Sequence, residues 1–133
     1  MSGSCETYEY AVLRVVPRVE RGERINAGVV LYCPGRRFLE ARVHLDRERL
    51  RALDPDLDAG AVEEHLASAR RVCAGGPEAG ALGSLPPRER FGRVVAPRST
   101  IIQPSPVHTG LCEDPDEELE RLMRQMVYRP GRE

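Results

Sequence analysis

The chain has 133 residues but contains no lysine and no tryptophan, and aromatic residues make up only 5% of it. Its 20 basic residues are therefore all arginines, whose side chain binds carboxylates and phosphates through two parallel hydrogen bonds. The arginines are interleaved with 21 acidic residues, and the formal net charge is −1. Because neither sign of charge dominates, the composition gives no argument for binding nucleic acid or an anionic membrane.

Several common motifs are missing as well. The four cysteines form no Cys-x-x-Cys pair, which excludes the spacing of a zinc finger or a thioredoxin-type site, and there is no glycine-rich phosphate loop. No apolar run approaches the roughly 20 residues that span a bilayer. The opening segment MSGSCETYEY lacks the basic start and apolar stretch of a signal peptide. We therefore expect a cytoplasmic protein with reduced thiols, no metal site and no cofactor.

The first third of the chain has the alternation and composition of β-strands, over residues 7–17, 24–33 and 38–45. Pro34 and Gly35 between the second and third strands predict a type II turn, so the three strands should form an antiparallel meander. The odd-numbered residues from Ile25 to Cys33 are expected to share one face of this sheet.

Helical signals follow the predicted meander. Asp46, Asp58 and Asp114 each precede apolar residues at helical spacing and are suited to cap a helix. The composition of residues 98–103 predicts a later strand, which Pro104 should end because proline cannot donate to a ladder.

These elements predict one α+β domain over residues 1–133. Its antiparallel sheet should have about four strands, an N-terminal three-stranded meander plus one later strand, covered on one face by helices. We also expect a flexible loop at residues 74–85 and a disordered tail at residues 129–133.

Residues 90–112 contain no acidic residue, although charged residues make up 31% of the chain. Within this segment, Arg98, Ser99 and Thr100 in succession could hold a phosphate or carboxylate, with the guanidinium as a fork and the hydroxyls completing it. His108 is the one candidate for an acid or base, because an imidazole can both donate and accept a proton. The alternative is purely structural, because the prolines by themselves would make a strand leave the sheet.

A second unusual segment is ERGERINAG, in which Asn26 and Gly28 interrupt a strand of β-branched residues. Glycine inside a strand suggests a bulge or the close approach of another chain segment. Glu23 beside it could pair with the later strand. A bulge with a surface ion pair and a ligand site are both open interpretations, and Asn26 and Arg98 would face one cleft if the later strand paired near the second.

The pattern YEYAVLRVVP…RGERINAGVVLYCP…RFLEARVHLD, followed by RSTIIQPSPVHTGL, resembles the bacterial family called domain of unknown function 3037 (DUF3037) over essentially the whole chain. Arg24 and Ala27 depart from the residues usual in that family. The resemblance implies no established activity. Genes of this family often lie beside the gene of a HipA-like kinase, and the resemblance therefore implies an accessory role beside a partner protein. The positions that the resemblance marks as binding residues are Glu23, Asn26, Gly28, Arg98, Ser99, Gln103, His108 and Thr109.

Two functions remain open from the sequence. The first is a non-catalytic accessory or regulatory binding module that docks on a partner protein, which the resemblance suggests is a HipA-like kinase. The second is a small enzyme or sensor that binds a phosphorylated or carboxylated metabolite through Arg98 and His108. No catalytic residue is assigned beyond the candidate His108.

Overall fold

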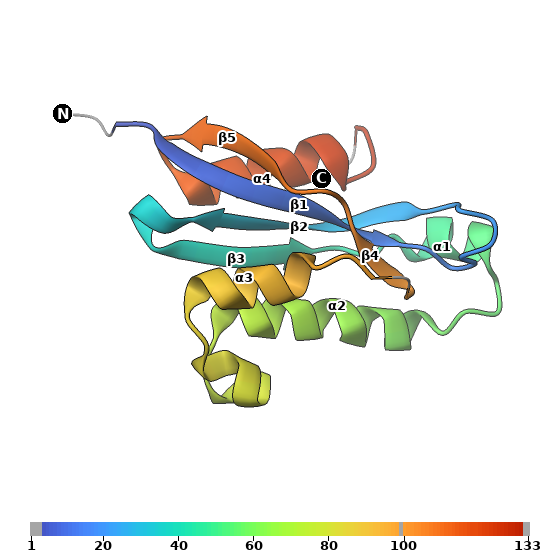
Figure 1. Ribbon diagram of the computed structural model, residues 1–133. Helices are drawn as coiled ribbons and strands as arrows, with labels where there is room; N and C mark the ends of the chain where they lie inside the picture. Colours follow the sequence, from blue (N-terminus) through green and yellow to red (C-terminus); the bar gives the residue numbers. More distant parts are fainter. Residues whose placement is uncertain (1–3, 99, 132–133) are drawn as a thin grey trace.

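In a computed structural model, which describes residues 4–98 and 100–131, the chain forms an open antiparallel sheet (Figure 1). Strand β1 lies at its centre between β2 on one side and both β4 and β5 on the other, and β3 pairs with β2. The strands are β1 (Glu6–Val15), β2 (Ile25–Cys33), β3 (Phe38–Val43), β4 (Ile102–Pro104) and β5 (His108–Cys112).

Helices cover both faces of the sheet. Figure 1 shows α2 and α3 along one face and α4 against the other. The helices are α1 (Arg47–Leu53), α2 (Ala59–Ala74), α3 (Pro87–Val95) and α4 (Pro115–Met126), with short 3₁₀ turns at η1 (Pro34–Arg36) and η2 (Pro77–Ser84). None of the helices in the described part of the chain has the length and apolar character that crossing a bilayer requires.

The predicted α+β class is confirmed, with two differences in detail. A fifth strand is present, because the chain pairs with β1 again after the prolines, at β5. A second face is also covered, because the stripe of α4 residues Leu119, Leu122 and Met123 packs on Leu31 of β2. The sequence pattern of β2 is apolar at nearly every position, which is the pattern of a strand buried on both faces.

A β-bulge in β2 explains why the odd-numbered residues of this strand divide between the two cores. Leu13 pairs with Gly28 and Arg14 pairs with Asn26, so Ala27 is the extra residue. Ile25 therefore packs with the α2 and α3 core, whereas residues 29, 31 and 33 face α4. The bulge was one of the two interpretations that the sequence left open, but the expectation that the odd-numbered residues of this strand share one face was wrong, because the bulge reverses the alternation.

The turn between β2 and β3 also differs from the prediction. Pro34–Arg36 form the 3₁₀ turn η1, and the residue with a left-handed backbone is Arg37, with φ of 53°. Gly35 does not have the positive φ that a type II turn requires at its third position. The antiparallel pairing of β2 with β3 was predicted correctly.

β4 ends at Pro104 as predicted, but the chain does not leave the sheet after it. Pro104 pairs with Leu13, the next residue donates its backbone N–H to the carbonyl of Val12 at 2.8 Å, and β5 then continues along β1. A proline is tolerated here because β4 is an edge strand, whose outer N–H groups need no ladder partner. The chain therefore follows β1 instead of leaving the sheet.

The three predicted caps are present. The side chains of Asp46, Asp58 and Asp114 accept hydrogen bonds from the first-turn backbone N–H groups of α1, α2 and α4. The segment predicted to be a flexible loop, residues 74–85, contains the 3₁₀ turns of η2. In the segment predicted to be a disordered tail, Arg129 pairs with Asp46 at 2.6 Å, and residues 132–133 lie outside the described residues.

Candidate functional site

The polar residues that the sequence singled out fall on two faces of the sheet. His108 pairs directly with Tyr10, and their rings lie 5.4 Å apart, so His108 lies on the face that α4 covers. Arg98 lies near α3, on the opposite face, and lines a cavity with residues of α2 and β4. Since these two side chains line different pockets, one anion cannot be held by both.

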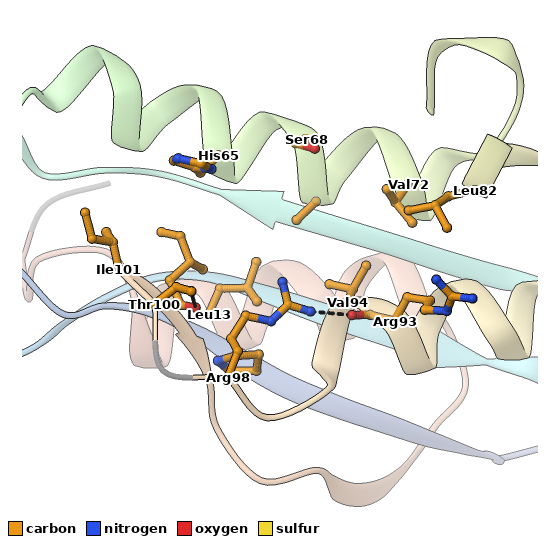
Figure 2. A pocket seen from close by; sticks show the side chains of 13 residues that line it. Leu13, His65, Ser68, Val72, Leu82, Arg93, Val94, Arg98, Thr100 and Ile101 are labelled. Atoms are coloured by element: carbon orange, nitrogen blue, oxygen red, sulfur yellow. Dashed lines mark hydrogen bonds between the residues drawn. The ribbon is translucent and has the colours of Figure 1, made fainter. Parts of the chain in front are cut away.

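The cavity that Arg98 lines has a volume of about 340 Å³ (Figure 2). Arg98 donates from Nη2 to the carbonyl oxygen of Arg93 at 2.5 Å and from Nε to that of Ala96 at 3.3 Å. These two carbonyls lie at the C-terminal end of α3, where helix carbonyls lack intrahelical partners. The guanidinium is therefore held at the rim of the cavity by its own local backbone, and we call this space the Arg98 cavity.

Other polar side chains of this segment bond to nearby backbone. The hydroxyl of Thr100 donates to the carbonyl of Ile102 at 3.0 Å, and the amide of Gln103 donates to the carbonyl of Thr100 at 3.0 Å. Thr100 lines the Arg98 cavity, whereas Ser99 lies outside the described residues. Thr109 pairs with Glu9 and is exposed.

On the other face, Asn26 beside the bulge of β2 lines a second pocket of about 350 Å³. We call it the basic hollow, because two arginines and a histidine line it, and no acidic residue does among those that the structure describes. Its lining residues are Tyr10, Val12, Arg14, Arg24, Asn26, Ser105, His108 and Met126. The hollow brings Asn26 and His108 together, two of the residues predicted to bind.

The arginines of the basic hollow have no acidic partner in the described part of the chain. The ion pairs between described residues engage other arginines, namely those at positions 18, 21, 36, 42, 47, 71, 88, 121 and 129. Arg14 instead donates to the backbone carbonyls of Gln103 and Pro104, at 3.2 and 3.1 Å. Burial lowers the pKa of Arg14, and the charge of Arg24 lowers it further. Two like charges are thus held close enough to repel each other.

Asn26 has a structural contact in this hollow. Its Nδ2 donates to the carbonyl of Met126, the last residue of α4, at 3.0 Å. The bulged strand thereby holds the C-terminal end of α4 against the sheet. Ser105 similarly accepts the backbone N–H of Val12 at 2.8 Å, which keeps the segment between β4 and β5 against β1.

The remaining predicted residues line neither pocket. Glu23 pairs with Arg21 at 2.8 Å instead of with the later strand. Gly28 permits close approach, because a Cβ atom added there would lie 2.8 Å from the carbonyl oxygen of Arg42. Asn26 and Arg98 do not face one cleft, since β4 pairs with β1 and not with β2.

Sequence reasoning missed Arg14, Arg24 and Ser105 as members of a site. The signal for Arg14 was available, because it is a charge inside the apolar run AVLRVVP, and such a charge must point to a polar surface. The convergence of Arg14 with His108 was not visible, since it depends on β5 pairing along the same strand as β4.

The chain is an α+β domain with an open antiparallel sheet, helices on both faces and a pocket on each side. The register of the strands brings the polar residues of these pockets together. Nothing in the described residues assembles three or more His, Cys, Asp or Glu side chains that could hold a metal ion. A family model described as protein of unknown function (DUF3037) matches residues 10–127, and the chain therefore belongs to this family. Comparisons with curated proteins and with solved structures find no match.

Proposed function

We propose that this chain is a non-catalytic accessory or regulatory binding module that docks on a partner protein, and that its basic hollow receives an acidic group of that partner. The observation that carries the proposal is the pair Arg14 and Arg24, which face one hollow together without an acidic partner in the described residues. A carboxylate placed between them would relieve their repulsion and accept charge-assisted hydrogen bonds.

The edge of the sheet beside the hollow supports docking of an extended segment. β5 begins at His108, a residue of the hollow, and pairs only with β1 in the described part of the chain. Its outer backbone groups are therefore open to a further strand. Leu111 in this strand is 67% exposed, although it is a large apolar residue.

Strand alternation explains how one partner segment could use both features. His108 and Leu111 are three residues apart in β5, so their side chains lie on opposite faces of the sheet. A strand added along β5 would present alternate side chains to these same faces. We therefore propose a partner segment that alternates acidic and apolar residues, with an acidic residue in the hollow and an apolar residue against Leu111.

The test uses the full chain and a short fluorescent peptide of alternating glutamate and leucine, with binding followed by fluorescence anisotropy. We expect binding that weakens as salt is added, and loss of binding when the glutamates are replaced by glutamines. Arg24→Glu should weaken binding about tenfold or more, because it replaces an attraction with a repulsion. Arg24 is exposed, and no ion pair between described residues engages it, so this variant should remain folded.

Arg51→Glu is the matched control, because Arg51 is also exposed but lies in α1 and lines neither pocket. Equal binding of the acidic and the glutamine peptide would contradict the proposal, as would an equal loss in the two variants. A HipA-like kinase is the partner protein to test first in the same assay, because the family resemblance suggests it.

A further inference from the structure

We propose that the Arg98 cavity binds a small organic acid, whose hydrocarbon body fills the apolar interior and whose carboxylate reaches the arginines at the rim. This inference is independent of the proposed docking function. The cavity lies on the face covered by α2 and α3, whereas the basic hollow lies on the face covered by α4.

The interior of the cavity is apolar and is lined by packed core residues. Its floor contains Leu13 of β1, Val72 of α2 and Val94 of α3, which are at most 8% exposed and belong to one core cluster. Ile101 and Ile102 add partly buried aliphatic surface from the β4 side. These elements cannot close the space without moving packed core residues, so an apolar ligand would gain contact without displacing the protein.

The rim has the opposite character. Arg93 and Arg98 line it together, and none of the described residues that line the cavity is acidic. Figure 2 shows His65 and Ser68 of α2 across the cavity from Arg98. Among the described residues, the ion pairs engage neither of these two arginines.

Arg98 is also oriented in advance. Two of its nitrogens, Nε and Nη2, donate to the carbonyls at the end of α3, and no hydrogen bond between described residues engages Nη1. Fixing the guanidinium in this way reduces the side-chain entropy that ligand binding would otherwise cost. A carboxylate is an acceptor with the planar geometry that arginine donors match.

The size of the cavity limits the ligand. A volume of about 340 Å³ is at the lower end of the range of about 300–1,000 Å³ that small-molecule pockets occupy. The ligand class is therefore a small monocarboxylic acid with a branched aliphatic or single-ring body, and not a nucleotide or a long acyl chain.

The experiment is an NMR titration of the ¹⁵N-labelled full chain with phenylacetate, with phenylacetamide and inorganic phosphate as separate arms. We expect saturable shifts with phenylacetate at the amides of α2 and β4 that border the cavity. Phenylacetamide should bind about tenfold more weakly or not at all, because it lacks the charge. Inorganic phosphate should not produce the same shifts, because it lacks the apolar body.

Three variants test whether phenylacetate binds in the cavity or elsewhere on the surface. Arg98→Gln should weaken phenylacetate binding about tenfold, and Ser68→Leu should block the cavity from its rim while leaving the core residues in place. Arg70→Gln, on an exposed position of α2 that does not line the cavity, is the matched control and should bind normally. The spectra themselves report whether each variant is folded.

Absence of saturable shifts with phenylacetate would overturn the proposal. Equal affinity for the acid and its amide would overturn the role of the arginines. Equal shifts with inorganic phosphate would show a general anion site and would overturn the assignment of an organic acid.

Discussion

The substitution Gly28→Ala tests whether the close approach of β2 and β3 depends on a residue without a side chain. A Cβ atom at this position would lie 2.8 Å from the carbonyl oxygen of Arg42 and 3.0 Å from a side-chain carbon of Val43. Favourable contacts between such atoms lie at about 3.5–4.0 Å. The added methyl group would therefore push β3 away from β2 by several tenths of an ångström, at the position where Gly28 pairs with Val43.

We expect Gly28→Ala to lower the free energy of unfolding by about 1–3 kcal/mol, the usual cost of overpacking a buried site. Gly92→Ala is the matched control. Gly92 lies inside α3, and a Cβ atom added there would meet no atom of the described residues within 4 Å. It should raise the free energy of unfolding by about 0.5–1 kcal/mol, because alanine favours a helix over glycine.

The assay is urea unfolding monitored by far-ultraviolet circular dichroism. The free energies of unfolding of both variants are extrapolated to water with one common slope of free energy against urea concentration. The two substitutions add the same methyl group, so opposite signs can come only from the local structure. A Gly28→Ala protein as stable as the parent chain would refute the close approach of β2 and β3, and with it the structural explanation of this glycine.

Two further predictions concern titrating groups. Burial raises the pKa of the Cys73 thiol to about 12 and that of Cys112, beside the Cys33 thiol, to about 11. A thiol-specific reagent at neutral pH should therefore modify the exposed Cys5 quickly and the buried thiols only after unfolding, and rapid modification of all four would contradict the fold. The hydrogen bond from Arg121 lowers the pKa of Glu118 below its usual 4.5, against the effect of burial, so its stabilising contribution is present above that value and is lost as the pH falls through the lowered pKa. Acid titrations of unfolding should show a shallower loss of stability for Glu118→Gln than for the parent chain, and identical slopes would contradict this.

The elements of the fold could be predicted because their signals are local. The caps at Asp46, Asp58 and Asp114 follow from short-range chemistry, and so does the pairing of β2 with β3. The bulge was also visible in the sequence, since Asn26 and Gly28 are unusual residues inside a strand. The effect of the bulge on the two faces of the strand could not be predicted. One extra residue moves every later side chain of the strand to the opposite face.

The candidate site could not be predicted as a whole, because its residues come together through long-range register. Arg98 and His108 are ten residues apart and looked like one anion site, yet the prolines between them lead the chain along β1 and the two side chains reach opposite faces. The basic hollow needs Arg14 from the central strand and Arg24 from the loop before β2. Only the pairing of β4 and β5 along one strand shows that these residues meet.

The central claim is that an acidic segment of a partner docks at the basic hollow and along β5. The most direct measurement is an NMR titration of the ¹⁵N-labelled chain with the alternating glutamate and leucine peptide. We predict that the shifted amides cluster at His108–Cys112 and around Arg14 and Arg24, and that they return toward their free positions as salt is added. Shifts confined to the α2 and α3 face, or spread evenly over the surface, would contradict the account.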